Sequence, residues 1–391
     1  VMKKLVTLVA ITLLFMIPVK MQAQASFAFT YTGTTSQIDS ACTFAGNIWG
    51  EYLVSSVPIK IGLFYGNLFG TTLAITIPNG KRDFPSAPLD SVWYPSCLAN
   101  AMEGVEINPG EADMNIFFDS SQPWYFGTDG NCPSNKYDFI TTLLHEIGHG
   151  LGFLSLAKLE GDTLGSFGYI VASDLSPLTT TFPFPDLQGK YSVFASYMET
   201  NTFQSLVDAA LFPNPSNLLG SKFKSNNLWF NGPYAMAVNG GNHVRIFAPT
   251  TFAQGSSMEH LNESTFPPSN INTLMTPYEG LSEEHHSPGP LTIAILRDIG
   301  WSIVPGIGIE NMLTNSRIHV FPNPIETSAN IYLDETVENV PLQIIDFSGK
   351  VVMNINFTAQ KGIYSPIDLS GLPTGIYLLR INGSSLKLIK S

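Results

Sequence analysis

The pentapeptide His-Glu-Ile-Gly-His at residues 145–149 constrains this chain more than any other stretch. Residues four apart lie one above the other on an α-helix, so the imidazoles of His145 and His149 can bind one metal ion. Glu146 then lies beside that ion, where a carboxylate can take a proton from a zinc-bound water as that water attacks a peptide carbonyl. The pattern predicts a zinc-binding helix with two ligands and one general base.

The residues around the pentapeptide support a buried helix. Asp138 is of a type that begins helices, and apolar side chains recur at helical spacing after it, at Phe139, Leu143, Leu144, Ile147 and Leu151. A chance match of the motif is expected on the order of once per hundred proteins with so few histidines. Chance would not also supply an apolar face, and we therefore interpret the motif as functional.

Length and composition limit the class of protein. A chain of 391 residues is long enough for two domains, or for one large domain with an appendage, and 44% hydrophobic residues suffice for a core. The formal net charge of −12 and the lack of a basic cluster argue against nucleic acid as a partner.

The N-terminus has the three parts of a secretory signal peptide. Basic Met2-Lys-Lys precedes an apolar run at residues 5–17, and Ala23-Gln-Ala25 offers a cleavage site. We assign residues 1–25 to the signal and expect no transmembrane segment in the mature chain. The alternative is an N-terminal anchor helix, for which the run is short.

Export permits disulfides, and the chain has three cysteines, Cys42, Cys97 and Cys132. At most one internal pair can form. We favour Cys97 with Cys132, because both precede the predicted zinc helix in the same half of the domain, although the sequence leaves the connectivity open.

The region before the motif predicts an α+β arrangement. We expect a helix with Asp39 as its cap, strands at residues 57–65 and 71–77, a short helix at 96–102 and a strand at 113–118. This order resembles the N-terminal half of zincin proteases, in which the last strand lies at the cleft edge and pairs with an extended substrate. The resemblance implies that role for residues 113–118.

A catalytic zinc needs a third protein ligand. The extended metzincin pattern H-E-x-x-H-x-x-G-x-x-H continues only to Gly152, because Ser155 occupies the next ligand position. The other histidines are His243, His260, His285, His286 and His319.

Two later segments resemble the leishmanolysin-like metzincins. One is Gly255-Ser-Ser-Met-Glu-His260, and the other is Asn272-Thr-Leu-Met-Thr-Pro-Tyr278. The resemblance implies a zincin-like catalytic domain in which His145, His149 and His260 bind zinc, Glu146 is the base and Met275 forms the Met-turn. Tyr278 lies at a different spacing from the tyrosine that follows the Met-turn in some metzincins.

The third ligand has a competing assignment. In a gluzincin arrangement a downstream glutamate would bind the metal, and Glu279, Glu283 and Glu284 are the nearest candidates. We expect His285 and His286 to be exposed. Residues 156–254 form an insertion whose fold the pattern does not predict, and we expect it to pack over the cleft and to govern specificity.

The sequence pattern changes after residue 303. Short runs of alternating apolar and polar residues, separated by turns, predict a small all-β sandwich there. Phe321-Pro-Asn-Pro324, Asp346-Phe-Ser-Gly-Lys350 and Leu372-Pro-Thr-Gly-Ile-Tyr-Leu378 resemble the type A sorting domain of type IX secretion. The resemblance implies a Gram-negative cell that exports the chain through its periplasm to the surface or medium. The alternative is a substrate-binding or adhesive β-module.

We therefore expect a signal at residues 1–25, a catalytic domain at 26–303 with an insertion at about 156–254, a linker at 304–317 and a sorting domain at 318–391. The predicted function is a secreted zinc endopeptidase with one catalytic Zn2+, acting on protein or peptide substrates and exported by the type IX machinery. Calcium is possible but not indicated. The alternative is an exported adhesin or glycan-binding protein whose zinc site is structural, closed by four protein ligands.

Overall fold

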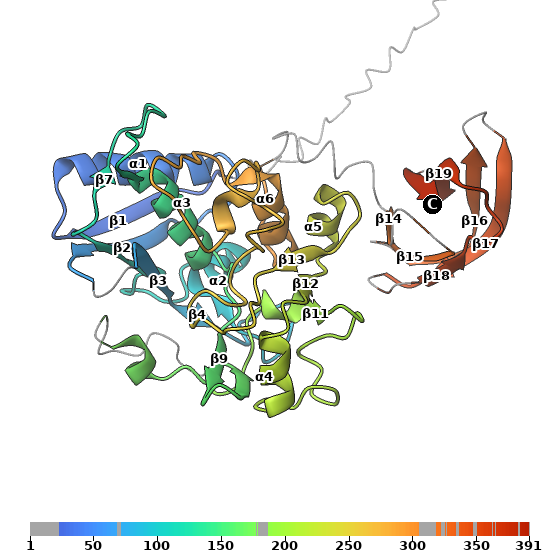
Figure 1. Ribbon diagram of the computed structural model, residues 1–391, viewed down its shortest axis with the longest axis horizontal. Helices are drawn as coiled ribbons and strands as arrows, with labels where there is room; N and C mark the ends of the chain where they lie inside the picture. The colour runs from blue at the N-terminus through green and yellow to red at the C-terminus, as the bar shows by residue number, and fades with distance from the viewer. Residues whose placement is uncertain are drawn as a thin grey trace, which may run out of the picture.

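The computed structural model describes residues 23–68, 72–176, 178, 187–304, 318–321, 325, 327–333, 336–346, 350–361, 363, 365–381 and 384–390. It is a mixed α/β body followed by a β-rich unit, which is orange to red in Figure 1. The two parts have separate hydrophobic cores, one among residues 25–301 and one among residues 318–388. Most of the predicted signal and linker lies outside the described residues.

A four-stranded sheet forms the N-terminal part of the body. Its strands β1 (Phe27–Thr32), β2 (Ile59–Gly66) and β6 (Met114–Asp119) are parallel, and β3 (Ala74–Pro78) pairs antiparallel with β6. The strand order is β1-β2-β6-β3, so β3 is an edge strand and β6 is internal. The expectation that residues 113–118 form the cleft edge was therefore wrong, because β3 returns to pair with β6 on its open side.

Two helices pack together beside this sheet (Figure 1). The indole Nε1 of Trp49 on α1 (Ser36–Gly50) donates to the Leu144 carbonyl of α3 (Phe139–Gly150) at 3.2 Å. Helix α1 begins earlier than predicted, because the extended Thr35 is its N-cap and Asp39 lies in the first turn, where it accepts a hydrogen bond from the Thr34 hydroxyl. Both helices bury their apolar faces, which join the core with the sheet.

Several shorter elements complete the body outside the insertion. They are α2 (Ser96–Glu103), the 3-10 turn η3 (Thr273–Met275), α6 (Gly289–Asp298) and the short strand pairs β4 (Gly80–Lys81) with β5 (Tyr94–Pro95) and β7 (Trp124–Tyr125) with β8 (Tyr137–Asp138). After α6, Trp301 Nε1 donates to the Leu151 carbonyl at 2.8 Å and ties the end of the body to α3.

The insertion has its own elements, which the sequence pattern did not reveal. A hairpin of β9 (Ala157–Glu160) and β10 (Leu164–Phe167) is followed by η1 (Ala172–Leu175) and η2 (Ala195–Tyr197). A sheet of β11 (Met198–Thr200), β12 (Leu228–Phe230) and β13 (Val244–Ile246) carries α4 (Asn217–Phe223) and α5 (Pro233–Val238) in its connections. Its buried phenylalanines, among them Phe167, Phe194 and Phe230, belong to the core of the body.

The C-terminal unit consists of two antiparallel sheets around one core. One sheet has the order β14 (Ile318–Phe321), β15 (Ser328–Leu333), β18 (Ser365–Asp368). The other has the order β17 (Val351–Ala359), β16 (Val337–Asp346), β19 (Gly375–Ile381), β20 (Ser384–Lys390). Alternate residues of β19 are buried, as the period-two pattern of its sequence predicts.

All three cysteines are free and buried, so the expected pair of Cys97 and Cys132 was wrong. Cys97 on α2 donates its thiol hydrogen to the Gly150 carbonyl, whereas the thiol of Cys132 lies against the carbonyl of Lys136 in a loop. The two sulfur atoms therefore face different neighbours. Within the described residues, no helix combines the length and the apolar character needed to cross a membrane.

Candidate metal centre

Helix α3 carries the pentapeptide and is fixed at its start by Asp138. The Asp138 side chain is fully buried and its Oδ1 accepts hydrogen bonds from Thr141 N at 2.7 Å and Thr141 Oγ1 at 2.8 Å. A carboxylate at this position pairs with otherwise unpaired amides of the first turn. The expectation that the helix starts near Asp138 is confirmed, and the apolar residues predicted for its buried face are all buried.

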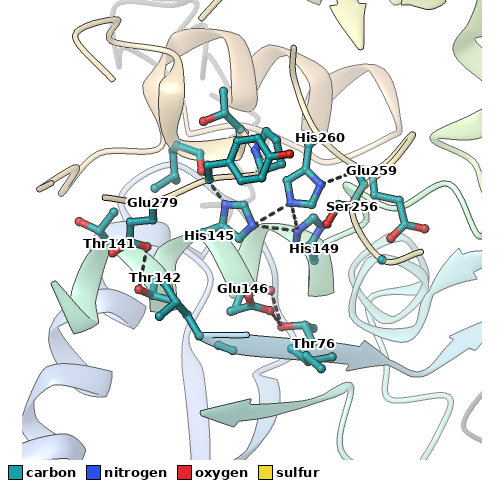
Figure 2. Close-up of a pocket in the computed structure, with 18 of the residues that line it drawn as sticks. Thr76, Thr141, Thr142, His145, Glu146, His149, Ser256, Glu259, His260 and Glu279 are labelled. Carbon is teal, nitrogen blue, oxygen red and sulfur yellow. Dashed lines mark hydrogen bonds between the residues drawn. The ribbon is translucent and has the colours of Figure 1, made fainter. Parts of the chain in front are cut away.

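Three imidazoles converge above this helix. The Nε2 atoms of His145 and His149 are 3.0 Å apart, and His260 Nε2 lies 3.1 Å from the first and 3.2 Å from the second. Figure 2 shows the three rings facing one another. The structure thus brings together the two histidines of the pentapeptide and the one that the leishmanolysin resemblance implied.

Each ring is oriented through its other nitrogen. His145 Nδ1 contacts the Leu274 carbonyl at 2.6 Å, His149 Nδ1 the Phe153 carbonyl at 2.8 Å and His260 Nδ1 the Ser256 carbonyl at 2.8 Å. A carbonyl can only accept, so each Nδ1 carries the hydrogen and each Nε2 keeps its lone pair. Such outer contacts fix the tautomer and orientation of metal-binding histidines.

Electrostatics keep these histidines neutral. Burial lowers the pKa of His145 to about 4, and burial with the charge of His145 lowers the pKa of His149 to about 3. Burial and the other two rings lower the pKa of His260 well below its usual value. Neutral imidazole is the form that binds a metal ion.

The donor set fits zinc. Tetrahedral zinc with nitrogen ligands at about 2.0–2.1 Å requires neighbouring ligand atoms roughly 3.4 Å apart. The observed separations of 3.0–3.2 Å are close to that value. Three imidazoles would supply three of the four ligands of a tetrahedral zinc ion.

Glu146 lies next to these rings, on the side of the sheet. Its side chain is 6% exposed, and its Oε2 accepts a hydrogen bond from Thr76 Oγ1 on β3 at 2.6 Å (Figure 2). Burial raises the pKa of Glu146 to about 7, although the bond to Thr76 opposes the rise. A carboxyl with a pKa near neutrality can both accept and return a proton.

Met275 packs against the helix at Gly148. Its side chain is fully buried in η3, and a Cβ atom at Gly148 would come 2.6 Å from its Sδ. The glycine therefore lets the methionine approach the helix between His145 and His149. Leu274, the neighbour of Met275, supplies the carbonyl that orients His145.

A cleft of about 470 Å³ runs over the centre. Its lining includes residues of β3 and α3 and residues from the segments at 254–260 and 273–285. Among the residues that the structure describes, four carboxyl groups line it, Glu146, Glu259, Glu279 and Glu283, and no lysine or arginine does. Burial raises the pKa of Glu259 to about 7.

The glutamates proposed as alternative ligands have other partners. Glu279 Oε2 accepts a hydrogen bond from Thr142 Oγ1 at 2.7 Å, Glu283 pairs with His285 at 3.0 Å, and Glu284 Oε1 accepts one from Cys132 N at 2.9 Å. The group of potential ligands that contains His145 and His149 has His260 as its third member.

The expectation that His285 and His286 are exposed was wrong. Both side chains are about one-fifth exposed. His285 contacts Glu283, and His286 Nε2 contacts Asp138 Oδ1 at 2.8 Å. Each histidine contacts a carboxylate, and no local sequence pattern indicated these two contacts. Tyr278, by contrast, is 62% exposed at the cleft and packs edge-on against Phe247.

Sequence reasoning missed Thr76 and the carbonyls of Leu274, Phe153 and Ser256. A threonine in a strand is common, and a backbone carbonyl has no sequence signal, so only the fold could identify them.

Comparisons with known families find matches for two parts of the chain. Residues 319–391 match the family model described as secretion system C-terminal sorting domain. Residues 91–181, which include the pentapeptide, match the model of a family described as SPBPB7E8-like. No curated protein and no solved structure matches the chain. The sorting domain indicates export by type IX secretion to the cell surface or outside, so the C-terminal resemblance is confirmed.

Proposed function

We propose that this exported chain is a zinc-dependent endopeptidase with a leishmanolysin-like metzincin centre. The observation that carries the proposal is the convergence of three neutral imidazoles beside a buried glutamate at the floor of an open cleft. His145, His149 and His260 would hold the ion. Met275 packed against the helix and the long interval between His149 and His260 support the leishmanolysin-like arrangement.

The chain's own groups suit peptide hydrolysis. A bound zinc ion would supply a Lewis acid and would lower the pKa of a water molecule. Glu146 accepts the proton of the attacking water and returns it to the leaving amine, since its pKa of about 7 suits both transfers. Thr76 orients the Glu146 carboxyl through Oε2 and leaves Oε1 for the water.

The edge strand β3 offers a way to hold an extended peptide. Leu73 O accepts from Asp119 N and Asn79 N donates to Asp113 O, so these residues direct their amides and carbonyls toward the β6 side. In an antiparallel ladder this direction alternates, and the backbone groups of Ala74 and Thr76 therefore point away from β6. Both residues line the cleft, where a substrate strand could pair with them.

Zinc content and casein cleavage, measured together on the wild type and two variants, test the proposal. Glu146→Gln should keep its zinc and lose cleavage, because the ligands remain and the base is gone. His260→Ala should bind one zinc fewer per chain and also lose cleavage. His243→Ala is the matched control, because it removes a buried histidine outside the cleft and should keep the zinc number of the wild type.

Full cleavage by Glu146→Gln would contradict the role of the glutamate. An unchanged zinc number in His260→Ala would move the third ligand to a glutamate such as Glu279. Zinc bound without cleavage of casein or any other protein tested would instead favour an exported binding protein with a structural ion.

A further inference from the structure

A second group of metal-binding side chains lies at the start of α3, apart from the three histidines. Asp138, Glu284 and His286 each offer one ligand atom, and these atoms lie within 4.8 Å of one another. Asp138 caps α3, whereas Glu284 and His286 belong to the segment between η3 and α6. We propose that these three residues bind a second divalent cation of the zinc class.

Asp138 provides the first support, because one of its carboxylate oxygens is hydrogen-bonded and the other is not. Oδ1 is contacted by Thr141 N, Thr141 Oγ1 and His286 Nε2, whereas Oδ2 makes no hydrogen bond with the described residues. The side chain is fully buried. A buried carboxylate oxygen without a donor is costly, and a cation would stabilise it.

The charges of the cluster provide the second support. The charged groups that act on His286 are Asp138, Glu284 and Asp129, and all three are acidic. One protonated imidazole could balance only one of the two carboxylates of the cluster, whereas a divalent ion balances both.

The distances suit an ion with short bonds. Zinc bonds of about 2.0–2.2 Å hold ligand atoms roughly 3 to 4.3 Å apart, depending on their angle. His286 Nε2 lies 2.8 Å from Asp138 Oδ1, slightly below this range, because these two atoms share a hydrogen bond that a bound cation would replace. The ligand atoms of the three residues lie within 4.8 Å of one another, so the farthest pair would have to approach by about half an ångström at most.

The ligand types select the class of ion. Imidazole nitrogen with two carboxylates suits zinc and its transition-metal neighbours, whereas calcium takes six to eight oxygen ligands. A cation here would join the start of α3 to the segment that includes Glu279, Glu283 and His285, all three of which line the cleft. The expected role is therefore to hold one wall of the cleft in position.

Counting zinc on the full chain tests the inference independently of cleavage. The protein is stripped with a chelator, dialysed against zinc chloride as the only divalent salt and analysed for metal per chain. The wild type should bind two zinc ions, and Glu284→Gln and His286→Gln one each. Glu283→Gln is the matched control: it neutralises the adjacent glutamate, which pairs with His285, and should keep both ions.

The two sites are separable in the same measurement. His260→Ala combined with Glu284→Gln should bind no zinc, because each change removes a different ion. Added zinc should also raise the melting temperature of the wild type more than that of Glu284→Gln. The inference is overturned if Glu284→Gln and His286→Gln both bind as much zinc as the wild type, which would leave His286 as a hydrogen-bonding partner of Asp138 only.

Discussion

Met275 packs against α3 at Gly148, which has no side chain. The glycine therefore allows the turn that carries Met275 to lie close to the helix. In Gly148→Ala the new methyl group would collide with Met275 Sδ. The strain of overpacking, about 1–3 kcal/mol, exceeds the gain of roughly 1 kcal/mol in helix propensity. We expect a net loss of about 1 kcal/mol in the free energy of unfolding, measured with denaturant.

The same substitution should weaken zinc retention, because η3 also carries the Leu274 carbonyl that orients His145. Gly66→Ala is the control, since no atom lies within 4 Å of a Cβ atom there. Equal stability and equal zinc retention in the two variants would show that Met275 does not support the helix.

At the scale of the element, one edge of β3 pairs with β6, and the other edge faces the cleft. In Ala74→Pro the strand loses an amide that faces the cleft but keeps its bonds to β6. Proline is tolerated on edge strands for this reason. One lost hydrogen bond of about 0.5–1.5 kcal/mol should raise KM for peptide substrates about two- to twelvefold, with zinc content unchanged.

Ile75→Pro offers the contrast, because its amide faces β6. That variant should lose stability, which a thermal melt detects. If Ala74→Pro leaves KM unchanged, the substrate does not pair with β3 at this residue.

The elements also show which parts of the fold can be predicted from the sequence. Helix α3 was predictable, because its cap, its apolar spacing and its histidines all lie within 15 residues. Strand order was not, since β3 and β6 are separated by α2 and their pairing depends on contacts that no local pattern encodes. His260 followed only from a resemblance, and Asp138 with His286 meet across an interval of 148 residues.

At the scale of the whole body, stability should depend on pH through Asp298. This carboxyl, at the end of α6, is 8% exposed and accepts hydrogen bonds from Tyr234 N and Ala235 N in the first turn of α5, each at 2.8 Å. Burial raises its pKa to about 8, although these bonds oppose the rise. It therefore joins the insertion to the helix that ends the body.

The sign follows from proton uptake. Between about pH 4, where an unfolded aspartate titrates, and about pH 8, the folded chain binds one proton more at Asp298 than the unfolded chain. The free energy of unfolding should fall as pH rises through this range, by at most about 1.4 kcal/mol per pH unit from this group. Asp298→Asn should flatten that slope in denaturant titrations, and an unchanged slope would exclude Asp298 as its source.

The three buried thiols affect how the whole molecule tolerates export. Burial raises the pKa of Cys42 to about 12, that of Cys132 to about 11 and that of Cys97 well above its ordinary value. Oxidation and disulfide exchange proceed through the thiolate, which is scarce at such pKa values. Export takes the chain into oxidising surroundings. The folded chain can therefore remain there with its three thiols unreactive. It has no disulfide that could exchange, and it needs no reducing partner.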